Sequence, residues 1–583
     1  MPDPANDNDQ AVSANSAASN PAAPIRLRVL PAIVIVAIHA AALAITLSLP
    51  TVIGNAIGIV GMPVLTALLL VVWWLAFSRV PWRDRFAGVA LFVASAAWIV
   101  VTQPQYKERI LSAALPALTT GIVLVLAATM RSGWPAQRTK AFLYIVACSL
   151  FFPMLRIDEV GGNLWPIMSW RWSATSDELA GGAENPGGKA VVSAQPGPLD
   201  WPAFRGPARD GVLHGVTIAT NWNEQPPKEL WRKRVGLGFS SFAAVGDYVF
   251  TQEQRKDREV VVCYKGGTGE EVWVNALDVR FDEAVGSGPR ATPTFDNGKL
   301  YTQGATGMLQ CLDAATGEAL WKTDVGADTG ASTPQWGFSG SPLVTDKHVV
   351  IFTGGAEGQA VIAYDKTSGT KAWCGGAHAG GYSSAHLAAI GGAPQIVVTS
   401  GFGVQAFEPA SGALLWQNEW RTKMNPRVVQ PMVVDGGRAV LVGTAEGKGT
   451  RYIEVGQTDT GWTAKEKWTS REFRPYFNDY VLHRGYCYGF DGDMFVCIDA
   501  ATGKRRWKGP KYGGQVLLVE NSDVLIVLSE KGEVVAVRAE PSAFEELAKF
   551  QAIEGKTWNH PVIANGRLFV RNAEEAACYA LAG

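Results

Sequence analysis

The segment C-L-D-A-A-T-G-E-A-L-W, residues 311–321, decides the fold, because copies of it return along the chain. Close copies are Y-D-K-T-S-G-T-K-A-W (364–373), F-E-P-A-S-G-A-L-L-W (407–416) and C-I-D-A-A-T-G-K-R-R-W (497–507), and a looser one is C-Y-K-G-G-T-G-E-E-V-W (263–273). In every copy a tryptophan stands four residues after a glycine. A pattern that returns after about 45 residues predicts a repeat architecture.

The residues ahead of each copy describe the repeating unit. Short apolar runs alternate with glycine turns, as in T-P-T-F-D-N-G-K-L-Y-T-Q (292–303). Asn-Gly and Thr-Gly turns between such runs are typical of β-hairpins, because glycine and asparagine adopt positive φ. Four short strands make a small sheet that cannot bury both faces alone. We therefore expect radially stacked sheets, which is a β-propeller.

The number of repeated tryptophans predicts the number of blades. A large apolar ring at this position is predicted to fill the wedge between neighbouring blades. The set is Trp231, Trp273, Trp321, Trp373, Trp416, Trp468 and Trp507, with Phe550 in the eighth place. Eight blades is the predicted number, and seven is the alternative. Two copies are degenerate, since Trp468 follows a longer turn and the stretch E-P-S-A-F-E-E-L (540–547) is predicted to be helical.

The two ends of the repeat region complement each other. Residues 229–233 (E-L-W-R-K) resemble a fourth strand without the preceding three, and residues 560–581 resemble three strands without the fourth. Pairing them would complete one blade from both ends and leave no open sheet edge.

The N-terminal part has a different composition. Residues 1–24 are rich in Ala, Asn, Asp, Ser and Pro, which predicts disorder. Five apolar stretches follow, at 29–49, 52–77, 86–104, 110–130 and 139–155, and we expect each to cross a membrane as a helix. The predicted domains are accordingly a tail (1–24), a five-helix transmembrane domain (25–158), an extracytoplasmic linker (159–200) and the propeller (201–583).

Basic residues between the stretches predict the orientation. Eight of them favour one side, where they would face the cytoplasm, and two favour the other. The eight are Arg26, Arg28, Arg79, Arg83, Arg85, Arg131, Arg138 and Lys140, and the two are Lys107 and Arg109. An odd number of spans then places the propeller outside the cytoplasm, in the periplasm of a Gram-negative cell. The lipid bilayer is a predicted partner, whereas the net charge of −1 gives no support for nucleic-acid binding.

Two polar residues lie within the apolar stretches. His39 and Asn55 are candidates for a functional role at membrane depth. A hydrogen bond between helices is the alternative for both.

The pattern D-x-x-T-G-x-x-x-W resembles the pyrroloquinoline quinone (PQQ) repeat, over about residues 200–583. Two families share this repeat: the quinoprotein dehydrogenases, and non-catalytic propellers such as the lipoprotein of the outer-membrane β-barrel assembly machinery. The stretches D-W-P-A-F-R-G-P-A-R-D-G-V (200–212) and R-I-D-E-V-G-G-N-L-W-P-I-M-S-W-R-W (156–172) resemble a third group of PQQ-like propellers. Five spans ahead of a propeller are similar to the layout of membrane quinoprotein glucose dehydrogenase.

Polar residues ahead of each blade's first strand are the candidates for the central channel. If the resemblance to the dehydrogenases includes the cofactor, three arginines suit its carboxylates, because guanidinium binds carboxylate in a bidentate manner. These are Arg290, Arg427 and Arg474, with Asn478 and Asp479 as calcium ligands and Asp479 or His386 as the catalytic base. Further polar residues expected along the channel are Gln335, Ser339, Ser341, Gln430, Asn559 and His560.

The cysteines and the blade size favour a non-catalytic protein. None of the seven cysteines is adjacent to another, and a C-x-x-C-H haem motif is absent from the sequence. Cys263, Cys311, Cys497 and Cys578 share one strand position and are expected to be buried there. Cys487 and Cys497 could pair across one hairpin in an oxidising compartment.

The preferred interpretation is a membrane-anchored binding or scaffolding module without a cofactor. It would hold a protein or cell-envelope partner at the propeller's rim or funnel. The alternative is a PQQ- and calcium-dependent alcohol or sugar dehydrogenase that passes electrons to a membrane quinone. The compact blades, at about 45 residues each, favour the first of these.

Overall fold

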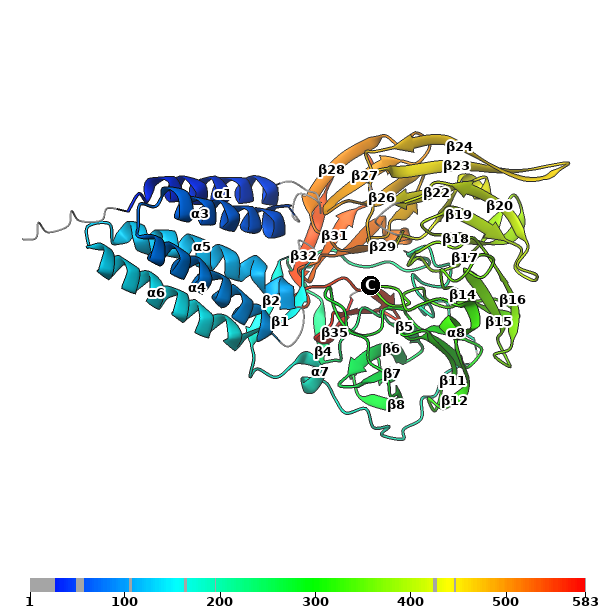
Figure 1. The fold of residues 1–583 in the computed structure, drawn as a ribbon. Helices are drawn as coiled ribbons and strands as arrows, with labels where there is room; N and C mark the ends of the chain where they lie inside the picture. Colours follow the sequence, from blue (N-terminus) through cyan, green and yellow to red (C-terminus); the bar gives the residue numbers. More distant parts are fainter. Residues whose placement is uncertain are drawn as a thin grey trace, which may run out of the picture. The chain divides into compact units, whose positions relative to one another are not determined.

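The structure is a computed structural model, and it describes residues 27–48, 57–103, 107–161, 165–193, 195–422, 427–444 and 447–581. The chain divides into a helical unit, residues 1–157 and 164–171, and a propeller unit, residues 158–163 and 172–583 (Figure 1). The predicted disordered tail and Asn55 lie outside the described residues.

The helical unit consists mainly of long apolar helices. They are α1 (Leu30–Ser48), η1 (Ile57–Gly61) leading into α3 (Met62–Phe77), α4 (Trp82–Val101), η2 (Lys107–Ile110) leading into α5 (Leu111–Ala128), and α6 (Trp134–Phe151) followed by η3 (Phe152–Met154). A two-stranded hairpin, β1 (Leu155–Val160) and β2 (Pro166–Trp170), comes next. His39 in α1 lies 2.7 Å from Thr66 in α3, Nδ1 to Oγ1, so this polar residue joins two helices.

Three of these helices are long and apolar enough to cross a membrane, among the residues that the structure describes: Ile57–Phe77, Trp82–Val101 and Leu111–Ala128. The apolar part of α1, Leu30–Thr46, is shorter. The first half of α6 carries Gln137, Arg138 and Lys140, which lower its hydropathy. Of the five helices predicted to cross a membrane, three therefore meet these criteria of length and apolar composition among the described residues.

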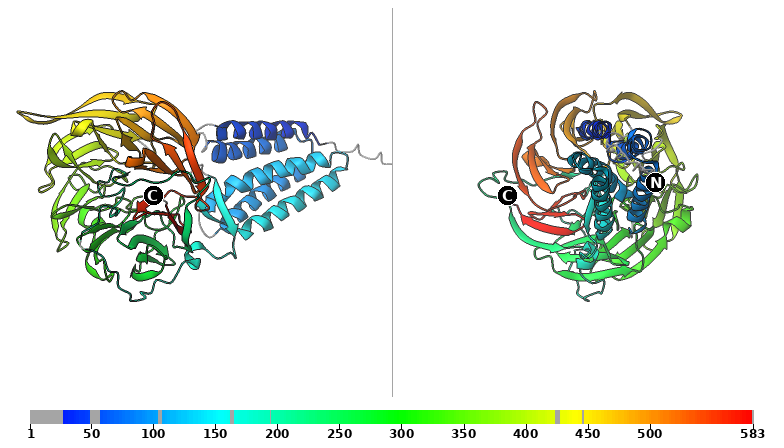
Figure 2. Two further views of the ribbon diagram at one scale, coloured as in Figure 1. Left: turned by 180° about the vertical axis from the view of Figure 1, so that it is seen from behind. Right: turned by 60° about the vertical axis from the view of Figure 1, so that its left-hand side comes forward.

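The propeller unit contains eight sheets of four or five strands, arranged in a ring (Figure 2). The strand labels of Figure 1 run outward from the centre of the ring, from β5 to β8 for example. Blades 1 to 4 are β5–β8 (Ala243–Val245, Tyr248–Arg255, Arg258–Lys265, Glu271–Leu277), β9–β12 (Thr294–Asp296, Lys299–Gln303, Met308–Asp313, Ala319–Asp324), β13–β16 (Leu343–Val344, His348–Phe352, Val361–Asp365, Lys371–Gly375) and β17–β20 (His386–Ile390, Ala393–Thr399, Gly403–Phe407, Leu414–Glu419). Blades 5 to 7 are β21–β24 (Met432–Val434, Ala439–Thr444, Gly449–Thr458, Gly461–Ser470), β25–β28 (Val481–His483, Tyr486–Asp491, Met494–Asp499, Arg505–Lys511) and β29–β32 (Gln515–Val519, Val524–Leu528, Glu533–Arg538, Glu546–Gln551). The short helices of this unit are α7 (Ser176–Leu179), α8 (Val325–Thr329), η4 (Asp435–Gly437) and η5 (Glu520–Ser522).

The eighth blade closes the ring from both ends of the propeller, as predicted. Its strands are β33 (Val562–Ala564), β34 (Arg567–Arg571), β35 (Glu575–Ala580) and β4 (Lys228–Arg234). Strand β4 pairs antiparallel with β35 and places Trp231 opposite Cys578. The predicted number of eight blades is confirmed.

The segment predicted as a linker makes contacts with the propeller. Its helix α7 contributes Asp177, which forms an ion pair with Arg280 at 2.8 Å. Further along, the Gly188 N–H donates to the Val272 carbonyl and the Ala190 N–H to the Ala315 carbonyl. Residues 173–193 thus lie along blades 1 and 2.

The repeated tryptophan joins each blade to the next. The Trp231 indole N–H donates to the Gly266 carbonyl at 2.8 Å, and the corresponding bonds of Trp273, Trp321, Trp373, Trp468 and Trp507 reach Ala314, Lys366, Pro409, Ala501 and Glu540. All of these indoles except Trp507 also cover the glycine of the corresponding turn in that next blade. A Cβ on Gly269 would meet the Trp231 ring at 2.8 Å. The motif therefore combines one blade's glycine with the preceding blade's tryptophan.

Trp416 is the exception to this pattern. Its indole N–H donates to Gln395 of its own blade at 2.6 Å. The next blade has a long hairpin, with β23 and β24 of ten residues each, so its turn lies farther from Trp416.

Phe550 does not occupy the eighth tryptophan position. In the other blades the tryptophan pairs with the residue before a β-bulge, as Trp273 does with Cys263. In blade 7 the residue at that place is Ala548, opposite Ala536, while Phe550 lies two residues farther along, opposite Val534. The predicted helix at 540–547 is also wrong, because Glu546 and Leu547 begin the outer strand β32. Pairing with β31 overrides the local helix preference of these residues.

The cysteines follow the strand register. Cys263, Cys311, Cys497 and Cys578 are buried opposite their blade's tryptophan, as predicted. Cys487 pairs with Ile498, one position away from Cys497, so the two side chains point to opposite faces of the sheet. The disulfide considered between them does not form, and both cysteines are free.

The contact between glycine and tryptophan has a matched test. Gly317 and Gly298 have φ of +74° and +73°, but only Gly317 lies beneath an indole, that of Trp273. We expect Gly298→Ala to destabilise the propeller by about 1 kcal/mol through backbone strain alone. We expect Gly317→Ala to lower the free energy of unfolding by roughly a further 1–3 kcal/mol through overpacking. The thermal unfolding midpoint should therefore fall more for Gly317→Ala than for Gly298→Ala. Equal falls would contradict the proposed role of the contact.

Candidate functional site

The first strands of the blades begin around the central axis, and a set of hydrogen bonds links them there. The Ser241 N–H donates to Thr292 of the next blade, the Thr292 N–H to Ser341, and the Ser341 N–H to Ser384. The series continues from Ser384 to Gln430, from Gln430 to Asp479, and from Asp479 to Gln515, at 2.8–3.1 Å. Each bond runs from a backbone N–H to the side-chain oxygen at the equivalent position of the following blade. We call these seven residues the polar belt.

The polar belt includes three residues that the sequence placed along the channel. Ser341, Gln430 and Asp479 are all buried, and each accepts a bond from the blade before it. Gln515 continues the belt by donating to the Trp558 carbonyl of blade 8. The channel polarity predicted from the sequence is thus present, and it holds the blades together.

The chain itself enters the ring through residues 200–213, which we call the axial segment. Trp201 exchanges two backbone hydrogen bonds with Ala244 of blade 1, both at 2.8 Å, and the Pro202 carbonyl accepts from Phe295 of blade 2. Its last residues form β3 (Val212–Leu213), which pairs in parallel with β29 on the inner side of blade 7. Because it contacts inner strands on both sides of the ring, the axial segment lies within the central channel.

Two arginines of the axial segment are buried at the axis. The Arg205 guanidinium donates to the Asp210 and Tyr480 carbonyls and lies 3.2 Å from the Asp479 carboxylate. The Arg209 guanidinium donates to the Ser341 and Pro342 carbonyls. Both arginines have positive φ, 62° and 57°, a region that non-glycine residues rarely adopt. The backbone is therefore strained where it directs these two side chains.

We call Arg205, Arg209, Asp479, His386 and His560 the axial cluster, and it carries more positive than negative charge. Two buried arginines face one carboxylate, Asp479. Burial and the neighbouring Arg205 lower the pKa of Arg209 to about 9. Burial, with Arg209 and Arg205, lowers the pKa of His386 to about 3, so this histidine is neutral at pH 7.

His560 lies at the same place. Its Nε2 is 3.6 Å from the Asp479 carboxylate, and its ring meets Phe204 edge-on at 4.9 Å. Burial lowers the pKa of His560 to about 4, even though Asp479 acts in the opposite direction. The cluster is therefore cationic, with two neutral imidazoles.

The arginines predicted for a quinone are bound to protein groups in separate places. Arg474 makes a bidentate pair with Asp491, at 2.6 and 3.0 Å. The buried Arg427 donates to the Ser400 and Trp420 carbonyls. Arg290 donates to the Gly286 and Gly288 carbonyls and lies over the rings of Phe239 and Phe281.

The calcium ligands predicted from the sequence are also engaged. Asn478 donates to the Gly514 carbonyl at 2.6 Å, and the two Asp479 oxygens contact the Gln430 N–H and Arg205. No cluster of three His, Cys, Asp or Glu side chains suited to a metal occurs among the described residues. The residues that the sequence suggested for PQQ and calcium do not fit these groups as one set.

Two of the remaining predicted channel residues also form hydrogen bonds with the protein backbone. The Asn559 amide donates to the Ser240 carbonyl at 2.8 Å, which joins blade 8 to blade 1. The Ser339 hydroxyl donates to the Trp336 carbonyl, and Gln335 is exposed.

The connections between blades carry an aromatic cluster that the sequence analysis missed. It consists of the partly exposed Phe239, Trp336, Tyr476, Phe477 and Trp558, together with the buried Tyr382. Successive ring centroids lie 4.8–6.4 Å apart in the order Phe239, Trp558, Phe477, Tyr476, Trp336, Tyr382. We call this cluster the aromatic rim. The sequence contains a signal that could have predicted the aromatic rim. An aromatic residue stands two positions ahead of a polar belt residue in Phe239-x-Ser241, Tyr382-x-Ser384 and Phe477-x-Asp479.

A buried ion pair lies beside the aromatic rim. The Lys556 ammonium is 2.6 Å from the Glu159 carboxylate and lies over the rings of Phe239 and Trp558. Burial raises the pKa of Glu159 and lowers that of Lys556, and their mutual attraction opposes both changes.

The neutral axial histidines predict a pH dependence of stability. Below pH 6.5 the unfolded chain binds protons that folded His386 and His560 do not, so the free energy of unfolding falls as the pH decreases from about 6.5 towards 4. We expect His386→Gln to reduce this loss, which the unfolding midpoints of both proteins at pH 7.5 and pH 5 will measure. An unchanged slope in the variant would contradict the assignment.

Comparison with known proteins connects this propeller to two groups. A family model described as outer membrane protein assembly factor BamB matches residues 257–509. Outer membrane protein assembly factor BamB of Yersinia pestis is 24% identical over 316 residues, 50% of this chain and 75% of that protein. Quinohemoprotein alcohol dehydrogenase ADH-IIG of Pseudomonas putida is 39% identical over 79 residues, 13% of this chain and 11% of that protein.

Among solved structures, quinohemoprotein alcohol dehydrogenase from Comamonas testosteroni has a TM-score of 0.49 at 14% identity, covering 66% of this chain and 80% of that chain. The sequence matches and the eight-bladed ring agree on the repeat type. The C-terminal unit is a PQQ-like β-propeller, related in sequence both to the assembly factor BamB and to a quinohemoprotein alcohol dehydrogenase.

Proposed function

We propose that this protein is a membrane-anchored scaffold whose propeller lies outside the cytoplasm and binds a protein or cell-envelope partner without catalysis. The observation that carries the proposal is the axial segment, which occupies the channel where a propeller would hold a ligand. The apolar helices would serve as the anchor. The eight-to-two distribution of basic residues supports an N-terminus in the cytoplasm of a Gram-negative cell.

The axial segment supports the absence of a quinone cofactor. Arg205 and Arg209 are committed to carbonyls of blades 3 and 6 and to Asp479. A planar tricarboxylate would have to displace them and leave their buried charges without these partners. The belt residues Gln430 and Asp479 would likewise lose bonds between blades if they turned towards a ligand.

The aromatic rim supports a partner site on the connections between blades. Tryptophan and tyrosine are the residues that contribute most to protein interfaces, because they bury a large rigid area and retain a polar group. Trp336 and Tyr382 stack at 4.9 Å, and Tyr476 meets Trp336 edge-on. Four of the rim rings are held by neighbouring rings on two sides, so little side-chain entropy would be lost on binding.

The dehydrogenase remains the second candidate, supported by the 79-residue match to the Pseudomonas putida enzyme. In that case PQQ and calcium would supply hydride-accepting chemistry, and a membrane quinone would accept the electrons. The alcohol or sugar substrate would need a base, for which Asp479 and His386 are the candidates.

Titration with PQQ distinguishes the two candidates. We expect the purified full chain to take up no stoichiometric PQQ in the presence of Ca²⁺, and to reduce no dye with alcohols or aldoses. The reason is that the axial segment and its arginines occupy the channel. Tight one-to-one uptake with turnover would establish the dehydrogenase and reject the scaffold.

Photo-crosslinking tests the partner site. We expect a photoreactive phenylalanine at Trp336, and independently at Phe477, to give the same discrete adduct in intact cells. The matched control is Leu320, which is 51% exposed on β12, the outer strand of blade 2, and is not one of the rim residues. A phosphatase fused after residue 583 should be active in these cells, because it folds only outside the cytoplasm. Adducts from Leu320 alone, or an inactive phosphatase, would contradict the site or the orientation.

A further inference from the structure

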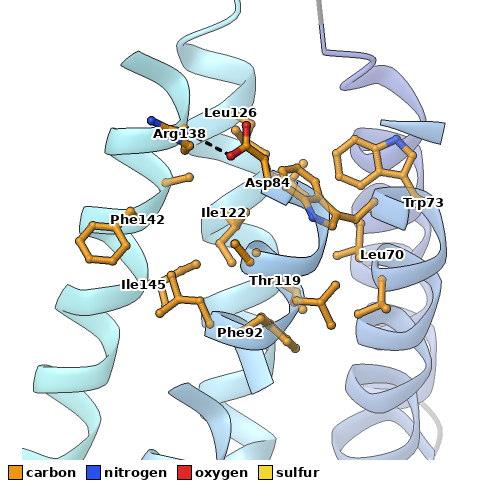
Figure 3. A pocket seen from close by; sticks show the side chains of 18 of the residues that line it. Leu70, Trp73, Asp84, Phe92, Thr119, Ile122, Leu126, Arg138, Phe142 and Ile145 are labelled. Atoms are coloured by element: carbon orange, nitrogen blue, oxygen red, sulfur yellow. Dashed lines mark hydrogen bonds and ion pairs between the residues drawn. The ribbon is translucent and has the colours of Figure 1, made fainter. Parts of the chain in front are cut away.

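The helical unit contains a cavity of about 400 Å³ between α3, α4, α5 and α6. Its wall is formed mainly by apolar side chains, including Leu70, Phe92, Ile122, Leu126, Phe142 and Ile145. Figure 3 shows Asp84 and Arg138 together at one end, with Ile122, Phe142, Ile145 and Phe92 farther along. The volume falls within the range of about 300–1,000 Å³ that small-molecule sites occupy.

The polar groups in the wall are already bonded to the protein. The Thr119 hydroxyl donates to the Leu115 carbonyl at 2.7 Å, and the indole N–H groups of Trp73 and Trp74 donate to the Arg28 and Arg85 carbonyls. Such a wall offers a ligand dispersion contacts along its length rather than hydrogen bonds. A hydrocarbon chain is therefore the group that fits this wall.

The polar end of the cavity carries one carboxylate and one guanidinium. Asp84 accepts from the Trp134 indole N–H at 2.6 Å and pairs with Arg138 at 3.1 Å, so both of its oxygens have partners. The Arg138 side chain is 58% exposed, and its bond to Asp84 uses one of the five guanidinium N–H donors. The remaining donors make this end suitable for an anion.

Other basic residues lie at the same end of the bundle. The bonds of Asp84 join the first turn of α4 to the first turns of α6. The connections leading into these two helices therefore lie together, and they carry Arg79 and Arg131, while Arg83 lies in the first turn of α4. Basic residues around a pocket between membrane helices are the arrangement that recognises anionic lipid head groups.

We propose that the helical unit binds one anionic phospholipid, with an acyl chain in the α3–α6 cavity and the phosphate on Arg138. The acyl chain would pack against the apolar wall, and the phosphate would pair with the basic side chains at the polar end. This site lies in the helical unit and does not depend on whether the propeller is a scaffold or a dehydrogenase.

Lipid binding to the delipidated full chain in detergent tests the proposal, with native mass spectrometry counting bound molecules. We expect phosphatidylglycerol to bind at one copy and more tightly than phosphatidylcholine of the same chains. Arg138→Gln should weaken the binding of phosphatidylglycerol by about fivefold, which is the usual contribution of one basic residue to anionic lipid binding. Lys140→Gln, on the same helix but outside the cavity lining, is the matched control and should change little.

A second pair of variants tests the chain-binding part. Ala141 lines the cavity, whereas Leu143 is 57% exposed and does not. Ala141→Trp should abolish the bound phosphatidylglycerol, and Leu143→Trp should leave it in place, with size-exclusion profiles confirming that both variants fold. Equal binding of the two lipids, loss in both tryptophan variants, or displacement of the lipid by ubiquinone would overturn the proposal.

Discussion

A hydrogen bond from each blade to the next, made where the innermost strands begin, determines what the centre of this propeller can do. The polar belt from Ser241 to Gln515 uses side-chain oxygens on the axis to satisfy backbone N–H groups that would otherwise be buried without partners. An oxygen that holds two blades together is not available to a ligand without a loss of stability. The same bonds therefore fix the ring and engage the polar side chains at its axis.

The parts of the fold that the sequence predicts well are those in which the cause is local. The T-G turn and the tryptophan four residues later specify both sides of a contact between blades, so the number of blades and the closure by β4 follow from counting. Phe550 is a position that the spacing of the repeats predicts wrongly. A β-bulge after Ala536 sets the register in blade 7, and neither spacing nor residue type reveals it. Trp222, which comes from outside the repeat, packs edge-on against Phe550 instead.

The candidate site was harder to predict, because its residues were chosen by type and position rather than by partner. Arg474 was a candidate for binding a carboxylate of a cofactor. In the structure it binds the carboxylate of Asp491, in the following hairpin of the same chain. Arg205 and Arg209 were missed because they lie ahead of the first blade, and only the folded ring shows that this segment returns to the axis. Asp479 was found for its charge, but its surroundings assign it to Arg205 and the belt.

The axial segment can be regarded as a ligand that is covalently attached to its own receptor. A tethered group has a very high effective concentration at its site, so a free molecule must compete with it at a large disadvantage. The positive φ values of Arg205 and Arg209 make the segment strained by itself, and the contacts of the two guanidiniums with blades 3 and 6 compensate for this strain. Because the cluster retains more cationic than anionic charge, a competitor would have to be an anion that replaces several carbonyl contacts at once. Binding at the aromatic rim requires no such displacement, which is why we propose the rim as the partner site.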